Sequence, residues 1–210
     1  MHRSADDPIG VLRSAVARAV ADATSAGRSP IVLIDGPSGA GKSTLADLLI
    51  ARWPAEGRPR LVRMDDLYPG WDGLDAGSEA LGCDLLEPLR AIGAGSWQRW
   101  DWAGHHPAGV ELVAGGEPLV VEGCGTLSRR NAACADLTVW LVADDALRKA
   151  RALARDGETF AAEWDRWQAQ FERFVAREHP RAAANLVLDV TGLDLPGGIT
   201  DVRSGTTVES

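Results

Sequence analysis

Positive charge is scarce in this chain of 210 residues. Its 22 lysine and arginine residues stand against 30 aspartate and glutamate residues, and the formal net charge is −8. A nucleic-acid-binding protein usually carries a basic footprint, and the composition shows none, so we expect no nucleic-acid partner. A small local cluster of cations remains compatible with binding the phosphates of a small molecule.

Cysteine and long apolar runs are scarce as well. The three cysteines, Cys83, Cys124 and Cys134, are odd in number and lack metal-ligand spacing. We therefore expect reduced thiols, and neither a disulfide framework nor a zinc site. No apolar run approaches the roughly 20 residues that span a bilayer, and no signal-peptide pattern opens the chain. These absences predict a cytoplasmic protein without a membrane partner.

Lysine is the rarest charged side chain. Only Lys42 and Lys149 interrupt a set of basic residues that is otherwise arginine. A lysine in such a chain suggests a position where a compact point charge is needed. Lys42 stands out further, because it follows a glycine-rich segment.

Apolar runs of strand length alternate with stretches of helical periodicity. The chain length suits a single domain, residues 1–210, with a buried core. The alternation predicts an α/β fold in which a mainly parallel five-stranded sheet carries helices on both faces. Ligands of such sheets bind at the carboxyl ends of the strands. The predicted strands are residues 31–35, 60–64, 118–123, 137–143 and 185–190.

Helices are predicted before and between these strands. An Asp-Pro pair at 7–8 has the pattern of an N-cap and a first helical residue, so a helix is expected over 8–26. Another helix is expected over 78–92. Residues 144–178 should hold a basic helix and then a helix with an aromatic stripe, which core packing explains more simply than ligand binding. The tail 192–210 is rich in glycine, threonine and aspartate and is expected to be loosely ordered.

The segment GPSGAGKST, residues 36–44, is the most specific motif in the sequence. It fits G-x-x-x-x-G-K-[ST], in which glycines let successive backbone N–H groups point at phosphate oxygens. The helix that follows presents its positive end to the same anion. Lys42 is expected to reach the β- and γ-phosphates, and the Ser43 hydroxyl to ligate Mg²⁺. The residues expected to bind the nucleotide are Gly36, Ser38, Gly39, Ala40, Gly41, Lys42, Ser43 and Thr44.

Acidic side chains follow two of the predicted strands. Asp65 and Asp66 come after the second strand, and Glu122 ends the third. All three should therefore lie at the same sheet edge as the glycine-rich segment. Glu122 could hold Mg²⁺ through water, or could be a plain acid before a glycine turn. The aspartate pair is either a solvated turn or contains a base that takes a proton from a substrate.

These motifs together resemble the uridine kinase-like branch of P-loop small-molecule kinases. That branch includes nicotinamide riboside kinase, phosphoribulokinase and one type of pantothenate kinase. In its nucleoside kinases the second strand ends in an aspartate three residues before an aromatic, as Asp65 stands before Tyr68 here. An acid-glycine pair follows the next core strand, matched by Glu122 and Gly123. The resemblance covers roughly residues 30–190 and is most specific at the glycine-rich segment.

Two further elements of that branch have counterparts. An aromatic-Asp-aromatic element precedes the acid-glycine strand, matched by residues 100–102, and a histidine often follows five residues after the first aromatic, matched by His105. A basic lid helix follows the fourth strand, matched by Arg148, Arg151 and Arg155. These arginines are three and four residues apart and share one helix face. That face is either solvated or supplies cations to a phosphoryl group in transfer.

The resemblance implies a fold and a reaction. The fold would be a P-loop NTPase three-layer α/β/α sandwich with a short helical lid. The reaction would be transfer of the γ-phosphoryl of MgATP to a hydroxyl of a small molecule, nucleoside-like or another polyol metabolite. Asp65 would be the general base, the metal would be held by Ser43, Glu122 and Asp65, and ATP and Mg²⁺ would be the cofactors. Lys42 and one of the lid arginines would stabilise the charge of the transferred group.

The acceptor site is expected among aromatic and acidic side chains. Such a pocket suits a nucleoside, a polyol or a cationic metabolite, although core packing explains any single tryptophan equally well. The acceptor itself and the state of assembly, including a homodimer, stay open. The residues expected at the acceptor are Asp66, Tyr68, Trp71, Trp100, Asp101 and His105.

A second function is compatible with the same motifs. The chain could be a nucleotide-dependent switch that hydrolyses ATP slowly and acts through a protein partner. The acidic pair would then position Mg²⁺ or water only. A GTPase is disfavoured, because the guanine-reading pattern N-K-x-D is absent from the sequence.

Overall fold

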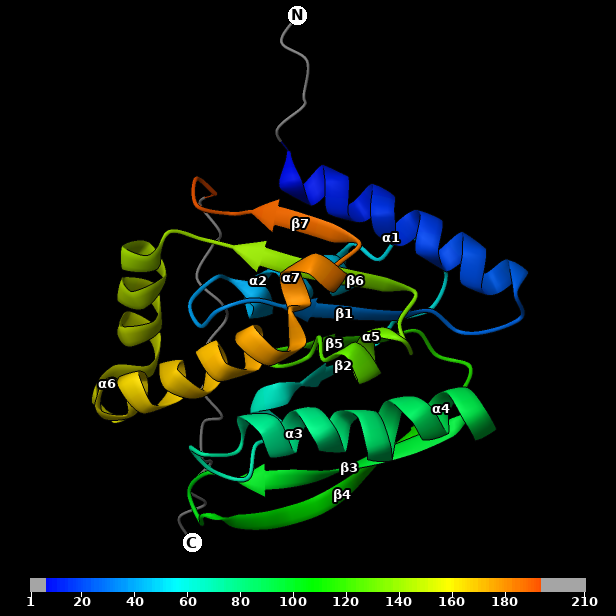
Figure 1. Cartoon of the computed structure of the whole chain (residues 1–210). Coiled ribbons are helices and arrows are strands. Elements are labelled where there is room, and N and C mark those ends of the chain that lie inside the picture. Colours follow the sequence, from blue (N-terminus) through cyan, green and yellow to red (C-terminus); the bar gives the residue numbers. More distant parts are fainter. Residues whose placement is uncertain (1–6, 194–210) are drawn as a thin grey trace, which may run out of the picture.

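The structure is a computed structural model that describes residues 7–193. A five-stranded parallel sheet with the order β2-β5-β1-β6-β7 forms its centre (Figure 1). The α/β class and all five predicted strands are confirmed, with ends that differ by at most one residue. The expectation for the tail falls outside the described residues from position 194 onward. The strands are β1 (Ile31–Asp35), β2 (Arg60–Arg63), β5 (Leu119–Glu122), β6 (Leu137–Val142) and β7 (Leu186–Asp189).

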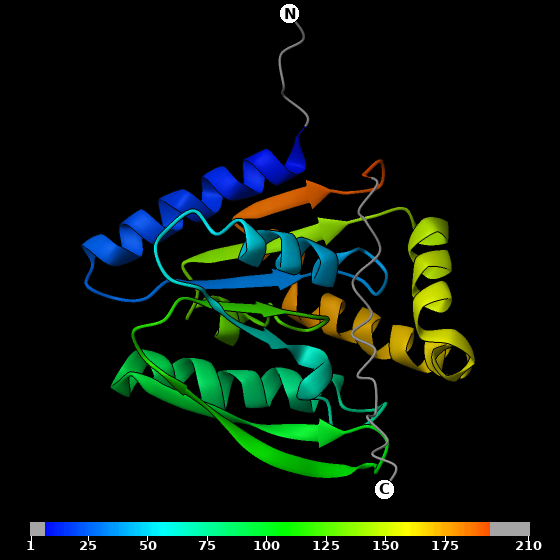
Figure 2. The ribbon, with the colours of Figure 1, turned by 180° about the vertical axis from the view of Figure 1, so that it is seen from behind.

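One face of the sheet is covered by α1 (Pro8–Ser25) and α2 (Lys42–Ala51), seen in front of the strands in Figure 2. The Asp7 carboxylate accepts a hydrogen bond from Ile9 N at 3.1 Å and caps α1, as the sequence predicted. Side chains alternate between the two faces of a strand, so Val32 and Ile34 of β1 pack against these two helices. This layer positions the start of α2 at the sheet's carboxyl edge.

The other face carries the remaining helices. Its core contains Ile31 and Leu33 of β1 together with the aromatic stripe predicted for the long helix, Phe160, Trp164, Trp167, Phe171 and Phe174. The stripe is therefore core, as expected. Within residues 7–193, none of the helices has both the length and the apolar character needed to cross a bilayer. The helices here are α3 (Leu74–Ala80), the π-helical turn η2 (Leu81–Leu86), α4 (Glu87–Ile92), α5 (Arg129–Ala132), α6 (Asp145–Glu178) and α7 (Pro180–Ala183).

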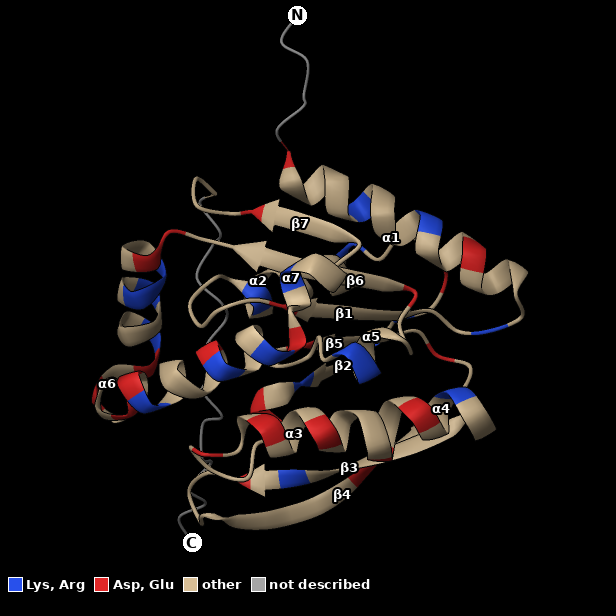
Figure 3. Cartoon of the chain, in the orientation of Figure 1, with Lys and Arg blue, Asp and Glu red and all other residues tan. Residues whose placement is uncertain are grey.

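The long element α6 bends sharply at Gly157, where φ is 67° and ψ is −155°. The two helices predicted for 144–178 are its two halves. The first half stands across the carboxyl ends of the strands, and the second returns along the sheet (Figure 1). Basic residues lie along both halves, interspersed with acids, and the helical run from α3 to α4 carries several acids too (Figure 3). The bend places a cationic helix beside the glycine-rich segment.

An antiparallel hairpin was not predicted from the sequence. Its strands are β3 (Ala94–Asp101) and β4 (His106–Ala114), which form a separate two-stranded sheet beneath α3 and α4 (Figures 1 and 2). Trp97 and Val113 face inward, while Val110 and Leu112 are exposed. Only one face is buried and glycines interrupt both strands, so neither produces the continuous apolar run that marks the central strands.

A buried carboxylate joins the amino-terminal ends of two central strands, at the end of the sheet opposite the glycine-rich segment. Asp136, which precedes β6, accepts hydrogen bonds from Ile31 N at 2.8 Å and Arg90 Nη2 at 2.5 Å, and it pairs with Arg28. Its side chain is 3% exposed. One carboxylate thus joins the end of α4 to the starts of β1 and β6.

We predict that Asp136→Ala lowers the free energy of unfolding by about 2 to 3 kcal/mol, because it leaves two guanidinium groups and a buried N–H without their partner. Chemical denaturation of the purified protein measures this. Asp22→Ala, an exposed acid on α1, is the control and should change stability by less than about 0.5 kcal/mol. Equal effects of the two substitutions would contradict the role given to Asp136.

Candidate active site

The glycine-rich segment forms a turn between β1 and α2. Gly41 has φ of 86° and serves as the N-cap, so that α2 begins at Lys42. The Lys42 ammonium is buried and folds back over its own loop, donating to Gly36 O at 2.8 Å and to Pro37 O at 3.0 Å. It also lies 3.4 Å from the thiol of Cys124. The cation is therefore held at the positive end of a helix, where an anion would bind.

The first half of α6 packs directly on this turn. Gly39 has φ of +77°, and a Cβ added there would overlap the backbone carbonyl of Arg148. A glycine is needed at this position both for the backbone conformation and for the close approach of the helix. The first half of α6, the predicted lid helix, thus shares a tight interface with residues 36–44, here called the cradle.

Beneath the turn lies a fully buried acid that the sequence reading did not single out. Asp35 ends β1, and its Oδ1 accepts from Gly36 N at 2.6 Å and Gly125 N at 3.1 Å. Its Oδ2 accepts from Leu127 N at 2.8 Å. Burial raises the pKa of Asp35 to about 6, against the opposing effects of these N–H groups and of Lys42. Asp35 ties the cradle to the loop that follows β5.

Glu122 lies where the sequence predicted, at the carboxyl end of β5 beside the cradle. It is 3% exposed, and the Ser43 side chain lies close enough to lower its pKa. Arg63, its register neighbour on β2, donates to Glu122 Oε1 at 3.2 Å and to Asp47 Oδ1 at 2.7 Å. Burial and the charge of Asp65 raise the pKa of Glu122, whereas Lys42 and Arg63 lower it. The structure brings together Ser43 and Glu122, two of the residues predicted to hold the metal.

Asp65 lies in the short 3₁₀ turn η1 (Met64–Asp66) that follows β2. The residue as a whole is exposed, but protein surrounds its carboxyl group. The resulting desolvation raises the pKa of Asp65, and the charges of Arg155 and Lys42 oppose that rise. Because water still reaches one side, the rise is smaller than in a sealed site. Asp66 lies 4.0 Å from Arg99 on the hairpin. Of the adjacent pair, Asp65 is the acid that senses both the cradle and the lid.

The three predicted lid arginines point to different places. Arg148 donates to Asp145 at 2.7 Å and to Gln168 at 3.3 Å, and Arg151 donates to Leu193 O at 3.1 Å. Arg155 forms a two-point pair with Asp156, and its charge also acts on Asp65 and Glu122. Of the three arginines, Arg155 is therefore the one whose charge acts on both Asp65 and Glu122.

The aromatic residues predicted at the acceptor divide into two kinds. Tyr68 is 1% exposed, its hydroxyl donates to Cys124 O at 2.6 Å, and burial raises its pKa well above its usual value. Trp71 is partly buried and its ring centroid lies 4.8 Å from that of Trp102. Trp102 in turn donates from Nε1 to Asp65 O at 2.8 Å. Trp100 is partly buried beside Gly70.

The polar residues predicted at the acceptor belong mostly to the hairpin turn. Asp101 Oδ1 accepts from Ala103 N at 2.9 Å and Gly104 N at 3.1 Å, and these bonds lower its pKa. His105 is exposed with φ of 54°. Asp101 thus stabilises the turn that carries His105. Asp72, in the loop between η1 and α3, is paired with Arg166 of α6 at 2.7 Å.

The donor atoms at the cradle fit a hard divalent cation. Within residues 7–193, no three or more His, Cys, Asp or Glu side chains gather as a metal site. The Ser43 hydroxyl and the Glu122 carboxylate are oxygen donors, as Mg²⁺ prefers, and two protein ligands suffice where phosphate oxygens and water complete the shell. The residues present therefore fit a magnesium ion that is bound together with a phosphate ligand.

Two residues of the site, Asp35 and Arg63, were not predicted from the sequence. Asp35 is the acid at the end of an otherwise apolar run, directly before the glycine-rich segment, and could have been noticed there. Arg63 had no signal, because its contact with Glu122 depends on the pairing of β2 with β5. Strand order cannot be read from a single chain of alternating elements.

We predict that Gly39→Ala destabilises the protein by about 2 kcal/mol more than Gly57→Ala. Both glycines have φ near +80°, at +77° and +82°, but a Cβ at Gly57 would meet nothing within 4 Å. Both variants carry the same backbone strain, of about 1 to 2 kcal/mol, and only the first forces α6 away from the turn. Urea denaturation compares them, and equal losses would show that α6 does not pack on Gly39.

We predict that the unfolding free energy falls as pH rises from about 4 to 6 through Asp35. Its folded pKa lies above its unfolded pKa, so in this window unfolding releases a proton, and stability declines by about 1.4 kcal/mol per pH unit. Asp35→Asn has no such proton. The difference in stability between wild type and variant should change across this window and stay constant above it. Parallel pH profiles would refute the raised pKa.

Comparisons with known proteins agree with this geometry at the level of the fold. No model of a protein family matches the sequence, and no curated protein matches it either. A solved structure described as a possible uridine kinase from Bacillus stearothermophilus aligns with a TM-score of 0.57 and 18% identity, over 85% of this chain and 99% of that one.

A second solved structure gives the same result. It is a candidate fructose transport system kinase from Silicibacter sp. TM1040, with a TM-score of 0.57 and 20% identity, over 86% of this chain and 98% of that one. Both likenesses extend over nearly the whole length of the other protein. The chain therefore has the fold of the P-loop kinases, as its resemblance to the uridine kinase-like branch implied.

Proposed function

We propose that the protein is an ATP-dependent kinase that phosphorylates a hydroxyl group of a small molecule. One observation carries the proposal: the carboxyl ends of β2 and β5, the start of α2 with its buried Lys42, and the first half of α6 meet at one edge of the sheet. There the charges of Lys42 and Arg155 act on the carboxyl of Asp65. A cradle cation, a lid cation and a strand-end acid thus come from three separate elements and converge on one place. A phosphotransferase needs this combination to position and neutralise a transferred phosphoryl group.

The cradle would bind the triphosphate of ATP. The N–H groups of the turn and of the first turn of α2 would face the anion, apart from that of Ala40, which is bonded to Pro37 O at 3.1 Å. Lys42 would exchange its present contacts with Gly36 O and Pro37 O for phosphate oxygens. The Ser43 hydroxyl and Glu122 would hold Mg²⁺, Glu122 through water. The ion would neutralise charge on the β- and γ-phosphates.

Asp65 is proposed as the general base. The acceptor oxygen forms a bond to the γ-phosphorus, the bond from that phosphorus to the bridging oxygen breaks, ADP leaves, and the acceptor proton passes to Asp65. A raised pKa suits this role, because a base works best when its pKa approaches the working pH. The bond from Trp102 Nε1 to Asp65 O fixes the backbone of this residue. Asp66 faces Arg99 and is not part of the proposed proton transfer.

Arg155 is proposed as the lid residue that stabilises the transferred group. Its charge already acts on Asp65 and Glu122, whereas Arg148 and Arg151 are bonded to Gln168 and to Leu193 O. The two-point pair with Asp156 orients the guanidinium group.

The acceptor is proposed to be a nucleoside-like molecule or another polyol. Trp71 and Trp100 remain as partly buried aromatic surfaces beside Asp65, and Asp66 and His105 as polar groups. Tyr68 and Asp101 are engaged in internal bonds and support these residues. The two solved structures with the same fold are described as a possible uridine kinase and a candidate fructose transport system kinase, and uridine and fructose both present hydroxyl groups.

We predict that ADP release from MgATP depends on an acceptor and that Asp65→Asn lowers its rate at least about 100-fold, the usual contribution of a general base. The assay would use a panel of nucleosides, riboside vitamins, pantothenate, sugars and polyols. ATP affinity, measured by calorimetry, should change by less than about threefold, because Asp65 serves the acceptor.

Asp66→Asn is the matched control: it removes a neighbouring charge that is proposed to contact the acceptor but not to take its proton. Its effect should fall on the KM for the acceptor, and kcat should stay within about threefold of wild type. Slow hydrolysis that ignores every acceptor and is equal in both variants would overturn the kinase proposal. That result would favour a nucleotide-dependent switch that acts through a protein partner.

A further inference from the structure

The loop after β5, residues 123–127 with the sequence GCGTL, lies between the cradle and the segment that carries Asp65. We call it the coupling loop. Three successive carbonyl groups in it accept hydrogen bonds from side chains, which is uncommon for a short loop. The bonds are Thr126 Oγ1 to Gly123 O at 2.7 Å, Tyr68 OH to Cys124 O at 2.6 Å and Ser78 Oγ to Gly125 O at 2.6 Å.

On one side the coupling loop is bonded to the cradle. Asp35 accepts from two of its N–H groups and from Gly36 N with one carboxylate. The Cys124 thiol lies 3.4 Å from Lys42 Nζ, 3.4 Å from Gly36 O and 3.5 Å from Ser38 Oγ. The loop is thus in contact with the cation that would bind phosphate.

On its other side the coupling loop is bonded to the chain that follows Asp65. Tyr68, which belongs to residues 64–73, here called the acceptor segment, and Ser78 of α3 both donate to carbonyl groups of the loop. Gly123 has φ of +147°, and a Cβ there would overlap Met64 and lie 3.2 Å from the Tyr68 hydroxyl. No larger residue fits between the loop and this segment, so a displacement of one must displace the other.

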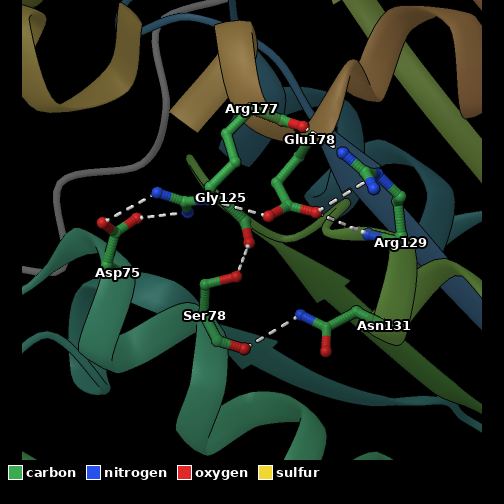
Figure 4. A network of polar contacts seen from close by, with 7 residues as sticks. All are labelled: Asp75, Ser78, Gly125, Arg129, Asn131, Arg177 and Glu178. Carbon is green, nitrogen blue, oxygen red and sulfur yellow. Dashed lines mark hydrogen bonds and ion pairs between the residues drawn. The ribbon is translucent and has the colours of Figure 1, made fainter. Parts of the chain in front are cut away.

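The helix that carries Ser78 is also bonded to its neighbours (Figure 4). Asn131 Nδ2 donates to Ser78 O at 3.0 Å, where α3 gives way to the π-helical turn η2. Arg177, near the end of α6, donates to Asp75 Oδ1 at 2.8 Å. Glu178 accepts from Arg129 N at 3.1 Å. Helix α3 therefore connects the coupling loop to the second half of α6.

The junction of α3 and η2 is not fully satisfied. Asn131 is completely buried, and its Oδ1 has no hydrogen-bond partner among the described residues. A Cβ added at Gly82 would lie 2.5 Å from that oxygen. A π-helical turn beside a buried atom without a partner is a place where a second arrangement has a modest energetic cost.

We infer that the coupling loop transmits occupancy of the cradle to α3, with Tyr68 and Ser78 as its positioning residues. The inference rests on the proposed function, because it requires nucleotide binding at the cradle. A phosphate ligand draws the Lys42 ammonium away from Gly36 O and from the Cys124 thiol. Cys124, which carries this thiol, also provides the carbonyl that accepts from Tyr68, and the carbonyl of Gly125 accepts from Ser78. Binding at the cradle thereby changes the stability of α3, which lies next to the acceptor segment.

Hydrogen exchange of backbone amides tests this without knowledge of the acceptor. The wild-type protein is compared with and without Mg²⁺ and the non-hydrolysable ATP analogue AMP-PNP. We expect the analogue to slow exchange in residues 74–86 at least about fivefold, because exchange reports local opening. In Ser78→Ala this slowing should be lost, while the Kd for the analogue, measured by calorimetry, stays within about twofold.

Two further variants make the result decisive. Tyr68→Phe removes the other bond to the loop and should give the same loss. Ser14→Ala removes a hydroxyl that donates to Gly10 O at 3.0 Å on the exposed side of α1, and it should keep the full protection. Protection of 74–86 that persists in Ser78→Ala and Tyr68→Phe would overturn the inference. Binding of AMP-PNP without any protection in wild type would overturn it too, whereas failure to bind would refute the proposed function itself.

Discussion

A single buried carboxylate, that of Asp35, holds the site together. Three N–H groups from two loops converge on its two oxygens. Burial favours the protonated acid, and the hydrogen bonds favour the carboxylate, which explains a pKa of about 6. The arrangement persists because the N–H groups have no other partner once the loops close over the end of β1.

The rest of the site is built outward from that point. Parallel strands bring the cradle, Glu122 and Asp65 to one edge, and the pairing of β2 with β5 places Arg63 beside Glu122. The bend at Gly157 then turns the cationic half of α6 toward these acids. Each charged group in the site is therefore held by an element whose position follows from the central sheet, and none depends on a free-standing loop.

The central fold could be predicted from the sequence because its signals are local. An apolar run such as IVLID reads as a buried strand by itself, and a glycine-rich segment between strand and helix has one common explanation. The hairpin escaped prediction because only one face of each strand is buried, so that Trp97, for example, stands between Ser96 and Gln98 and not within an apolar run. Register and strand order decide the contact of Arg63, and neither leaves a trace in the local sequence.

The predictions for the site fared unevenly for the same reason. Lys42, Ser43 and Glu122 lie together because strand ends meet at one edge of a parallel sheet. The lid arginines share a helix face in the sequence, yet Arg148 is bonded to Asp145 and Gln168, and Arg151 to Leu193 O. Of the three, Arg155 is the one whose charge acts on Asp65. Tyr68 has the spacing of an acceptor residue, but its burial and its bond to Cys124 O could not be foreseen.

The hairpin forms a sheet of its own, outside the five-stranded one. Apart from Trp102 and Arg99, its described bonds to the site are few, and its outer face carries the exposed side chains of Val110 and Leu112. Mutations in this appendage leave Asp35, Lys42 and Glu122 untouched. Under the proposed function, changes in β3 and β4 would alter which acceptor is bound, while the nucleotide site at the central sheet would stay the same.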